Sequence, residues 1–101
     1  MYAMVTRRRM NEARVQETRE LAMRDYQPLV QRAPGFVSFT LVRDEGGINI
    51  AIVLFESKAH ADAFEGEGER WRRKLAEMGH QIDTRESGEV TMHITPDSIL
   101  T

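Results

Sequence analysis

Three histidines, His60, His80 and His93, are the side chains of this sequence best suited to acid–base chemistry near neutral pH. None stands in a His-x-x-x-His pair or beside paired carboxylates, so the sequence predicts no metal site. His93 is the strongest candidate for a catalytic residue, because its surroundings predict a strand facing a cavity, where an imidazole can act as a base. The alternative for His93 is a hydrogen-bonded strand histidine or a dimer contact. We expect His60 at the edge of a helix stripe and His80 in solvent.

Large side chains at helical spacing could enclose a flat, aromatic ligand. Phe64, Trp71 and Met78 recur along one face of a predicted helix. The alternative is that they only pack a hydrophobic core. Tyr26 and Asn49 are further polar groups that could face a cavity. The predicted pocket lining is Tyr2, Arg7, Phe39, Phe64, Trp71 and Met78.

Arg7, Arg8 and Arg9 form the only dense basic run of the sequence. A nucleic-acid surface would need more basic residues nearby and aromatic residues for stacking. Glutamates follow instead, beginning at Glu12, and the net charge is −2. Phe39 with this run is too little for an RNA-binding sheet. We therefore expect no nucleic-acid partner and interpret the run as a solvated strand end or an intersubunit salt-bridge site.

The composition, with 41% hydrophobic and 30% charged residues, is typical of one globular domain over residues 1–101. The sequence has no cysteine, which excludes disulfides, thiolate metal sites and cysteine nucleophiles. The charges of the N-terminal MYAMVTRRRM follow its apolar stretch instead of preceding it, unlike a signal peptide. No apolar run reaches membrane-spanning length. We expect a cytoplasmic protein without a membrane partner.

A β-hairpin organises the predicted fold. Residues 36–43 and 48–55 are rich in β-branched and aromatic residues, and the turn at 44–47 contains two glycines. The second run is apolar on both faces, whereas a strand of an open antiparallel sheet normally keeps one polar face. Both faces of this strand therefore need a cover, one from helices of the chain and the other from a partner or an enclosed cavity.

Two helices flank the hairpin in the sequence. The first is predicted from Glu12 to about Asp25, with Asn11 as its N-cap, and Pro28 should break or kink it. Ser57 can cap the second helix and Gly79 can end it. The glycines at 66 and 68 weaken its middle, so it is interrupted there or approaches the sheet closely.

The first strand is predicted from Tyr2 to Met10, and the last from Val90 to Thr95, where Val90, Met92 and Ile94 alternate with polar residues. Residues 80–88 are interpreted as a polar turn with a short extended piece. The final residues, including Ile99 and Leu100, could dock on a neighbour.

The predicted order is strand, helix, strand, strand, helix, strand. This order is typical of an α+β, ferredoxin-like βαββαβ fold, with both helices on one face of a four-stranded antiparallel sheet. The other face would expose an apolar patch larger than monomers usually tolerate. We expect a homodimer, in which two sheets close into a dimeric α+β barrel around a cavity for a small ligand.

Short motifs agree with this layout: Pro34-Gly35-Phe36 leads into the second strand, and Ile52–Phe55 runs into Glu56-Ser57-Lys58-Ala59. With the element order, they make residues 2–95 resemble the antibiotic biosynthesis monooxygenase-like family of dimeric α+β barrels. The resemblance implies a cofactor-independent oxygenase that turns phenolic polyketides into quinones, a haem-degrading monooxygenase, or one of the many members of this family without a known activity. Haem degraders use an Asn, a Trp and a His, where this sequence has Arg7, Phe64 and Lys74. Haem is therefore not expected, and no cofactor is predicted.

Two functions remain open. The first is a cofactor-independent monooxygenase acting on an aromatic or polyketide-like small molecule, which predicts an apolar cavity into which His93 or an arginine reaches. The second is a non-catalytic dimeric module that binds a small hydrophobic ligand or stabilises an assembly. It predicts a cavity filled by Trp71, Phe64 and strand methyl groups, without a converging polar group.

Overall fold

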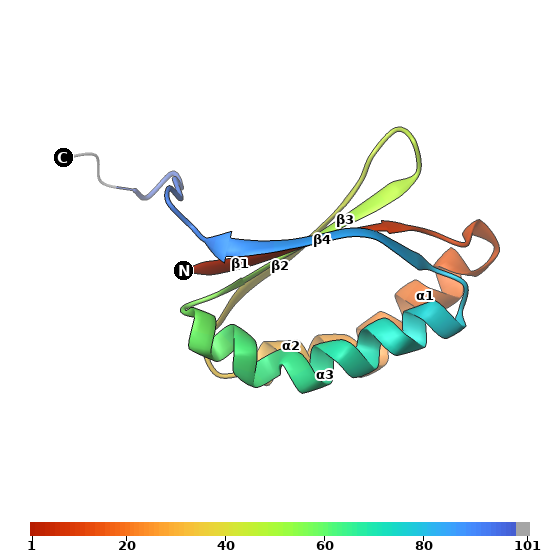
Figure 1. Ribbon diagram of the computed structural model, residues 1–101, viewed down its shortest axis with the longest axis horizontal. Helices are drawn as coiled ribbons and strands as arrows, with labels where there is room; N and C mark the ends of the chain where they lie inside the picture. The colour runs from red at the N-terminus through yellow and green to blue at the C-terminus, as the bar shows by residue number, and fades with distance from the viewer. Residues whose placement is uncertain (99–101) are drawn as a thin grey trace.

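The computed structural model describes residues 1–98, in which one antiparallel sheet is covered by helices on a single face (Figure 1). The four strands lie in the order β2-β3-β1-β4, which is the ferredoxin-like arrangement. The predicted fold class is confirmed; closure into a dimeric barrel involves a second chain and stays a prediction. The elements are β1 (Tyr2–Arg9), the 3-10 turn η1 (Glu12–Arg14), α1 (Val15–Leu21), the π-helical turn η2 (Ala22–Tyr26), α2 (Gln27–Arg32), β2 (Phe36–Arg43), β3 (Ile48–Phe55), α3 (Lys58–Glu77) and β4 (Gln81–Glu89).

The hairpin formed by β2 and β3 has the predicted bounds. Its turn is held by Asp44, whose carboxylate accepts a hydrogen bond from the Ile48 N–H at 2.9 Å. Gly47 adopts a φ of +83°, which a residue with a side chain rarely adopts. The turn chemistry therefore sets the register between the two strands.

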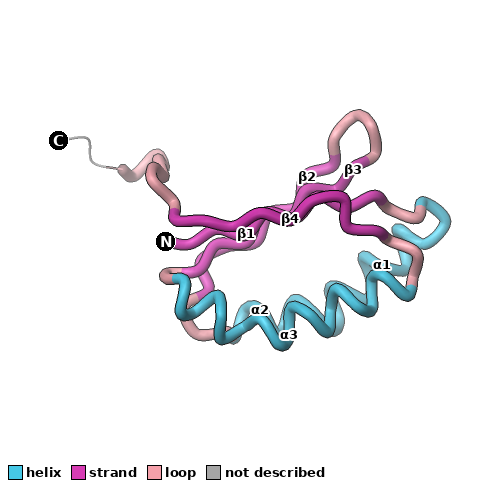
Figure 2. Tube along the Cα trace, in the orientation of Figure 1, coloured by secondary structure: helices cyan, strands magenta, loops and turns pink. Residues whose placement is uncertain are grey.

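The two faces of β3 have different surroundings. Val53 and Phe55 face the helices and are buried, and they form the core with Tyr26, Val30 and Phe64. Ile50 and Ile52 alternate with them and lie on the other face, half-buried. Figure 2 shows no helix over that face. The apolar second face predicted from the sequence is therefore present and has no cover from residues 1–98.

The sequence predicted that Pro28 would break or kink the first helix, but the helical run continues through this proline. α1, η2 and α2 form one run from Val15 to Arg32, with a wider turn just before the proline. The Gln27 N–H donates to the Ala22 carbonyl, five residues back. A π turn separates the proline ring from the preceding turn, which relieves the clash that would otherwise break the helix.

α3 is continuous through both of its glycines. Ser57 caps it as predicted, with its hydroxyl accepting from the His60 N–H at 3.2 Å. Gly79 ends it as predicted, with a φ of +89° and with the His80 N–H donating to the Leu75 carbonyl in a Schellman motif. Asn11 has a different role from the one expected. Its side chain does not cap its own helix but donates to the Met78 carbonyl at 2.9 Å, at the end of α3.

The last strand lies earlier in the sequence than predicted. β4 pairs with β1 from Arg9↔Gln81 to Tyr2↔Glu89, and beyond this register the Val90 N–H donates to the Met1 carbonyl at 2.8 Å, where the chain begins. Residues 90–98 lie outside the sheet, although their apolar alternation suggested a strand. β4 is polar because it is an edge strand, exposed along its whole length. The predicted docking residues Ile99 and Leu100 lie outside the described residues.

Candidate active site

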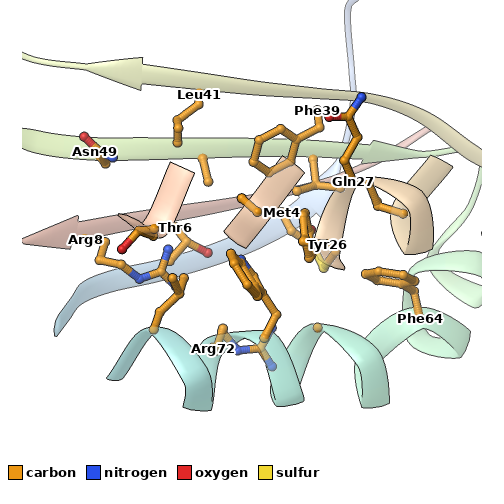
Figure 3. A pocket seen from close by; sticks show the side chains of 18 of the residues that line it. Met4, Thr6, Arg8, Tyr26, Gln27, Phe39, Leu41, Asn49, Phe64 and Arg72 are labelled. Atoms are coloured by element: carbon orange, nitrogen blue, oxygen red, sulfur yellow. The ribbon is translucent and has the colours of Figure 1, made fainter. Parts of the chain in front are cut away.

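A cavity of about 590 Å³ lies between the sheet and the helices. This volume is within the range of small-molecule sites. All four strands contribute its ceiling, and α1, η2, α2 and α3 contribute its floor and sides. Figure 3 shows polar side chains at one end, with Thr6, Arg8 and Asn49, and mostly aromatic side chains towards the other.

The aromatic end is built from three elements. Tyr26 of η2 stacks on Trp71 of α3, with ring centroids 5.1 Å apart and an interplanar angle of 25°. Phe39 of β2 and Phe64 of α3 meet Tyr26 edge-on, at 5.7 and 6.3 Å. These rings offer flat apolar surfaces against which another aromatic system can pack.

Arg8 dominates the polar end. Its side chain is only 8% exposed, yet within residues 1–98 it forms no ion pair and no hydrogen bond. Burial lowers the pKa of Arg8, and the charges of Arg72 and Arg85 lower it further. A guanidinium nevertheless stays protonated in proteins, so Arg8 brings an unneutralised positive charge to the cavity.

Asn49 lies directly beside Arg8, because the two residues are register partners on the neighbouring strands β3 and β1. Both side chains line the cavity. The Asn49 Oδ1 atom is buried and has no hydrogen-bond partner among the described residues. Thr6, two residues before Arg8 on the same face, is also buried and adds a hydroxyl group to this end.

Further charges lie on the side formed by α3 and β4. Glu65 pairs with Arg72 of its own helix and, at 3.0 Å, with Arg85 of β4. Its carboxylate is therefore shared by two arginines and is not available to Arg8. Gly68 leaves the room that Arg72 needs, since a Cβ atom at this glycine would lie 3.1 Å from an Arg72 Nη atom.

Tyr26 combines an aromatic ring with a hydroxyl group that forms no hydrogen bond within the described part of the chain. Burial raises the pKa of Tyr26, although the charges of Arg72 and Arg8 act in the opposite direction. The hydroxyl is therefore protonated at neutral pH and can donate to a ligand.

The structure places three of the six predicted pocket residues in the cavity wall, namely Phe39, Phe64 and Trp71. Tyr2 packs against the core, and its hydroxyl donates to Ser87 at 3.1 Å. Arg7 is exposed because it points to the opposite face of β1 from Arg8. Met78 is buried beyond the end of α3 and does not line the cavity.

The prediction of a strand position in the cavity for His93 is wrong. His93 follows β4, is exposed and does not line the cavity, because the sheet ends before it. His60 lies at the start of α3, where its Nδ1 is 2.7 Å from the Ser57 hydroxyl oxygen. No histidine belongs to the cavity wall within the described residues.

His80 is buried, with 1% exposure, although we expected it in solvent. Its Nδ1 accepts from the Asn11 N–H at 2.9 Å, so the ring proton lies on Nε2. Nε2 donates to the Thr18 hydroxyl at 2.6 Å, which in turn donates to the Arg14 carbonyl at 2.7 Å. Burial lowers the pKa of His80, helped by Arg8 and Arg14. His80 therefore joins α1 to the end of α3 as a neutral, structural residue.

Arg8 is the main residue that the sequence analysis missed. A signal for it existed, because Met4 and Thr6 share one face of β1 and the same alternation continues to Arg8. The run of three arginines obscured this signal, since its outer members are exposed and its middle member is buried.

Neither a family model nor a curated protein matches this sequence. Solved structures do match. A protein from Deinococcus radiodurans, assigned to the antibiotic biosynthesis monooxygenases, superposes with a TM-score of 0.77 and 9% identity over 97% of this chain and all of its own. The chain has the antibiotic biosynthesis monooxygenase fold.

Two Streptomyces enzymes share this fold. A monooxygenase from Streptomyces coelicolor, solved with nanaomycin D, has a TM-score of 0.71 and 17% identity, covering 95% of this chain and 92% of its own. SnoaB from Streptomyces nogalater, a cofactor-independent oxygenase, has a TM-score of 0.69 and 21% identity, covering 96% and 97%. The resemblance drawn from the sequence is therefore confirmed at the level of the fold, and a fold by itself does not fix a reaction.

No helix within residues 1–98 is both long and apolar enough to cross a membrane. In the same residues, no group of three or more acidic or histidine side chains is placed to hold a metal ion.

Proposed function

We propose that this chain is a cofactor-independent monooxygenase that oxidises an aromatic, polyketide-like molecule inside the cavity. The observation that carries this proposal is an unfilled cavity lined by a buried arginine, Arg8, that has no ion-pair partner within residues 1–98. Trp71 and Phe64 line the cavity without filling it. The hypothesis of an enzyme predicts an open cavity, whereas the hypothesis of a non-catalytic module predicts that these side chains fill it.

The chemistry requires little from the protein. A phenol bound beside Arg8 has its pKa lowered by the positive charge, so it ionises more easily. The phenolate places negative charge on ring carbons, where molecular oxygen can add. One oxygen atom enters the ring to give the quinone, the other leaves as water, and the substrate supplies all four electrons. The largely apolar wall keeps water away from the intermediate.

The two Streptomyces structures support this proposal, because one is called a monooxygenase and the other a cofactor-independent oxygenase. At 17% and 21% identity they support a reaction class and not a particular substrate. Ligand binding without catalysis is the second candidate. It is favoured by the lack of a histidine in the described cavity wall and by the pairing of Glu65, which leaves no free base there.

Oxygen consumption with a panel of phenolic naphthols and anthrones tests the proposal. The enzyme is expected to consume one oxygen per quinone formed, with EDTA present, and Arg8→Gln is expected to lose most of the rate. Arg73→Gln, an exposed arginine on α3, is the matched control. Tight binding of these compounds without oxygen uptake would establish the binding module instead.

We also propose that the chain acts as a homodimer, in which a second copy covers the outer face of the sheet. Val5, Val42, Ile50 and Ile52 form an apolar patch there. Such a patch, which residues 1–98 leave uncovered, is characteristic of an interface. Light scattering should give twice the 11.6 kDa of one chain. Ile52→Glu should reduce the mass to that of a monomer, whereas Leu29→Glu, on the exposed side of α2, should not.

A further inference from the structure

The polar end of the cavity contains two groups whose interactions are incomplete. Within residues 1–98, Arg8 is a cation that is only 8% exposed and has no counter-charge, and the Asn49 Oδ1 is a fully buried acceptor without a donor. Leaving a buried polar group unpaired costs about 1–3 kcal/mol, and more when the group is charged. These two costs arise side by side, because Arg8 and Asn49 are register partners on neighbouring strands.

No carboxylate in the described cavity wall is free to neutralise the charge of Arg8. Glu65 is the only carboxylate in the described cavity wall, and Arg72 and Arg85 already share it. Arg19 adds a fourth positive charge to the wall. A ligand that brings its own negative charge would therefore be favoured over a neutral one of the same shape.

We infer that Thr6, Arg8 and Asn49 form an anion subsite that determines which aromatic molecules bind. The ligand class is a fused aromatic ring system with an ionised oxygen, from a carboxylate or a phenolate, and a hydroxyl group on the neighbouring carbon. This inference rests on the proposed function for the position of the aromatic body, against Tyr26 and Trp71, but binding requires no oxygenation.

The two polar groups of this ligand are complementary to Arg8 and to the Asn49 Oδ1. The planar guanidinium of Arg8 can hold a carboxylate through two parallel hydrogen bonds, or a phenolate through one. An ionised oxygen only accepts hydrogen bonds, so it cannot satisfy the Asn49 Oδ1. The neighbouring hydroxyl supplies that donor. Figure 3 shows Thr6, Arg8 and Asn49 together at the end of the cavity opposite Phe64.

Trp71 provides a direct readout of binding. It is the only tryptophan of the sequence and lines the cavity, so changes in protein fluorescence report on a ligand at this place. Calorimetry then gives the affinity. The probes are 3-hydroxy-2-naphthoate, 2-naphthoate without the hydroxyl, and 2-naphthol without the carboxylate. A fourth probe, 2,3-dihydroxynaphthalene, can supply a phenolate.

The wild type is expected to bind 3-hydroxy-2-naphthoate most tightly and 2-naphthol most weakly. Arg8→Gln should weaken both acids by about tenfold or more, which is the usual loss for a hydrogen-bonded charge. Its binding of 2-naphthol should stay within about twofold, which also shows that this variant is folded. Asn49→Leu should remove the advantage of 3-hydroxy-2-naphthoate over 2-naphthoate, and Arg73→Gln should change nothing.

Proton release on binding distinguishes a phenolate from a carboxylate at Arg8. It is measured by calorimetry in two buffers of different ionisation enthalpy. Binding of 2,3-dihydroxynaphthalene with release of a proton identifies a phenolate at Arg8, and binding of the acids without release identifies a carboxylate. Equal binding of the acids and of 2-naphthol without proton release, or acid binding unaffected by Arg8→Gln, would overturn the subsite. Anion binding without oxygen uptake would refute only the proposed reaction. Oxygen uptake by the wild type, together with acid binding that Arg8→Gln leaves unchanged, would refute the subsite.

Discussion

Tyr26 and Trp71 stack on each other from two different helical segments, with their ring centroids 5.1 Å apart. The pair joins the π turn η2 to α3 and forms one wall of the cavity. The packing that stabilises the fold therefore also shapes the proposed binding site.

This stack should be measurable as a coupling energy. We expect Tyr26→Leu and Trp71→Leu each to lower the free energy of unfolding, and the double variant to lose less than their sum by about 0.5–1.5 kcal/mol, which is typical of an aromatic pair. Urea unfolding followed by circular dichroism measures all four proteins. Additive losses would show that the two rings stabilise the fold independently.

Arg8→Met is expected to stabilise the free protein. The substitution replaces a buried cation without a partner by an apolar side chain of similar length, so it removes a desolvation cost. Replacing buried charges in this way can gain about 1–4 kcal/mol. Thermal unfolding should therefore show a higher midpoint together with loss of naphthoate binding.

Arg73→Met is the control for this prediction, because Arg73 is exposed and pairs only with Glu69 on the same helix. Its midpoint should stay close to that of the wild type. A lower unfolding midpoint for Arg8→Met than for the wild type would mean that Arg8 stabilises the fold. It would contradict the prediction that Arg8 lowers the stability of the free protein in order to bind an anion.

His80 should make the stability of the protein depend on pH. Its pKa in the folded chain lies below the ordinary 6.5, so between these two values the unfolded chain binds more protons. The free energy of unfolding should therefore fall as the pH drops below about 6.5, and level off below the folded pKa. Urea unfolding at a series of pH values measures this loss.

The variant His80→Gln should show a flatter pH profile at lower overall stability, while His93→Gln, an exposed residue after β4, is the matched control. Nitrogen NMR should find the proton on Nε2 of His80, because Nδ1 accepts from the Asn11 N–H. An Nδ1–H tautomer would contradict the hydrogen-bond chain described here.

Two glycines of α3 should respond differently to substitution by alanine. At Gly66 an added Cβ meets nothing within 4 Å, so Gly66→Ala should stabilise the protein by about 0.5–1 kcal/mol through helix propensity. At Gly68 the Cβ would lie 3.1 Å from Arg72, so Gly68→Ala should lose this gain and displace the Arg72 guanidinium from Glu65. Urea unfolding measures the free energy of unfolding of both variants. Equal gains in stability would show that the Arg72 side chain moves away from the new Cβ atom without cost.

Local chemistry made the hairpin predictable from the sequence. Turn glycines, β-branched residues and the Asp44 side chain all favour the same bounds, and the structure has them. Ser57 and Gly79 were predictable for the same reason, because a helix cap depends on its immediate neighbours.

Features that depend on distant partners were not predictable. β4 has no apolar pattern, and its strand conformation comes from pairing with β1 at the edge of the sheet. Its position moved His93 out of the sheet and left His80 at the buried end of α3. Arg8 differs from Arg7 and Arg9 only in the face of β1 from which it projects. It is buried because the helices cover that face, and this cover is not visible in the local sequence.

The π turn η2 makes the length of the first helical run as important as its composition. A π turn holds one residue more than an α turn over about the same rotation, so η2 takes up one extra residue while the helical segments on either side keep the faces that they present. Deleting one residue between Ala22 and Tyr26 would therefore give a regular helix in which Thr18 still meets His80. The Pro28 ring would then clash with the turn before it, so the deletion is expected to destabilise the helix at this proline.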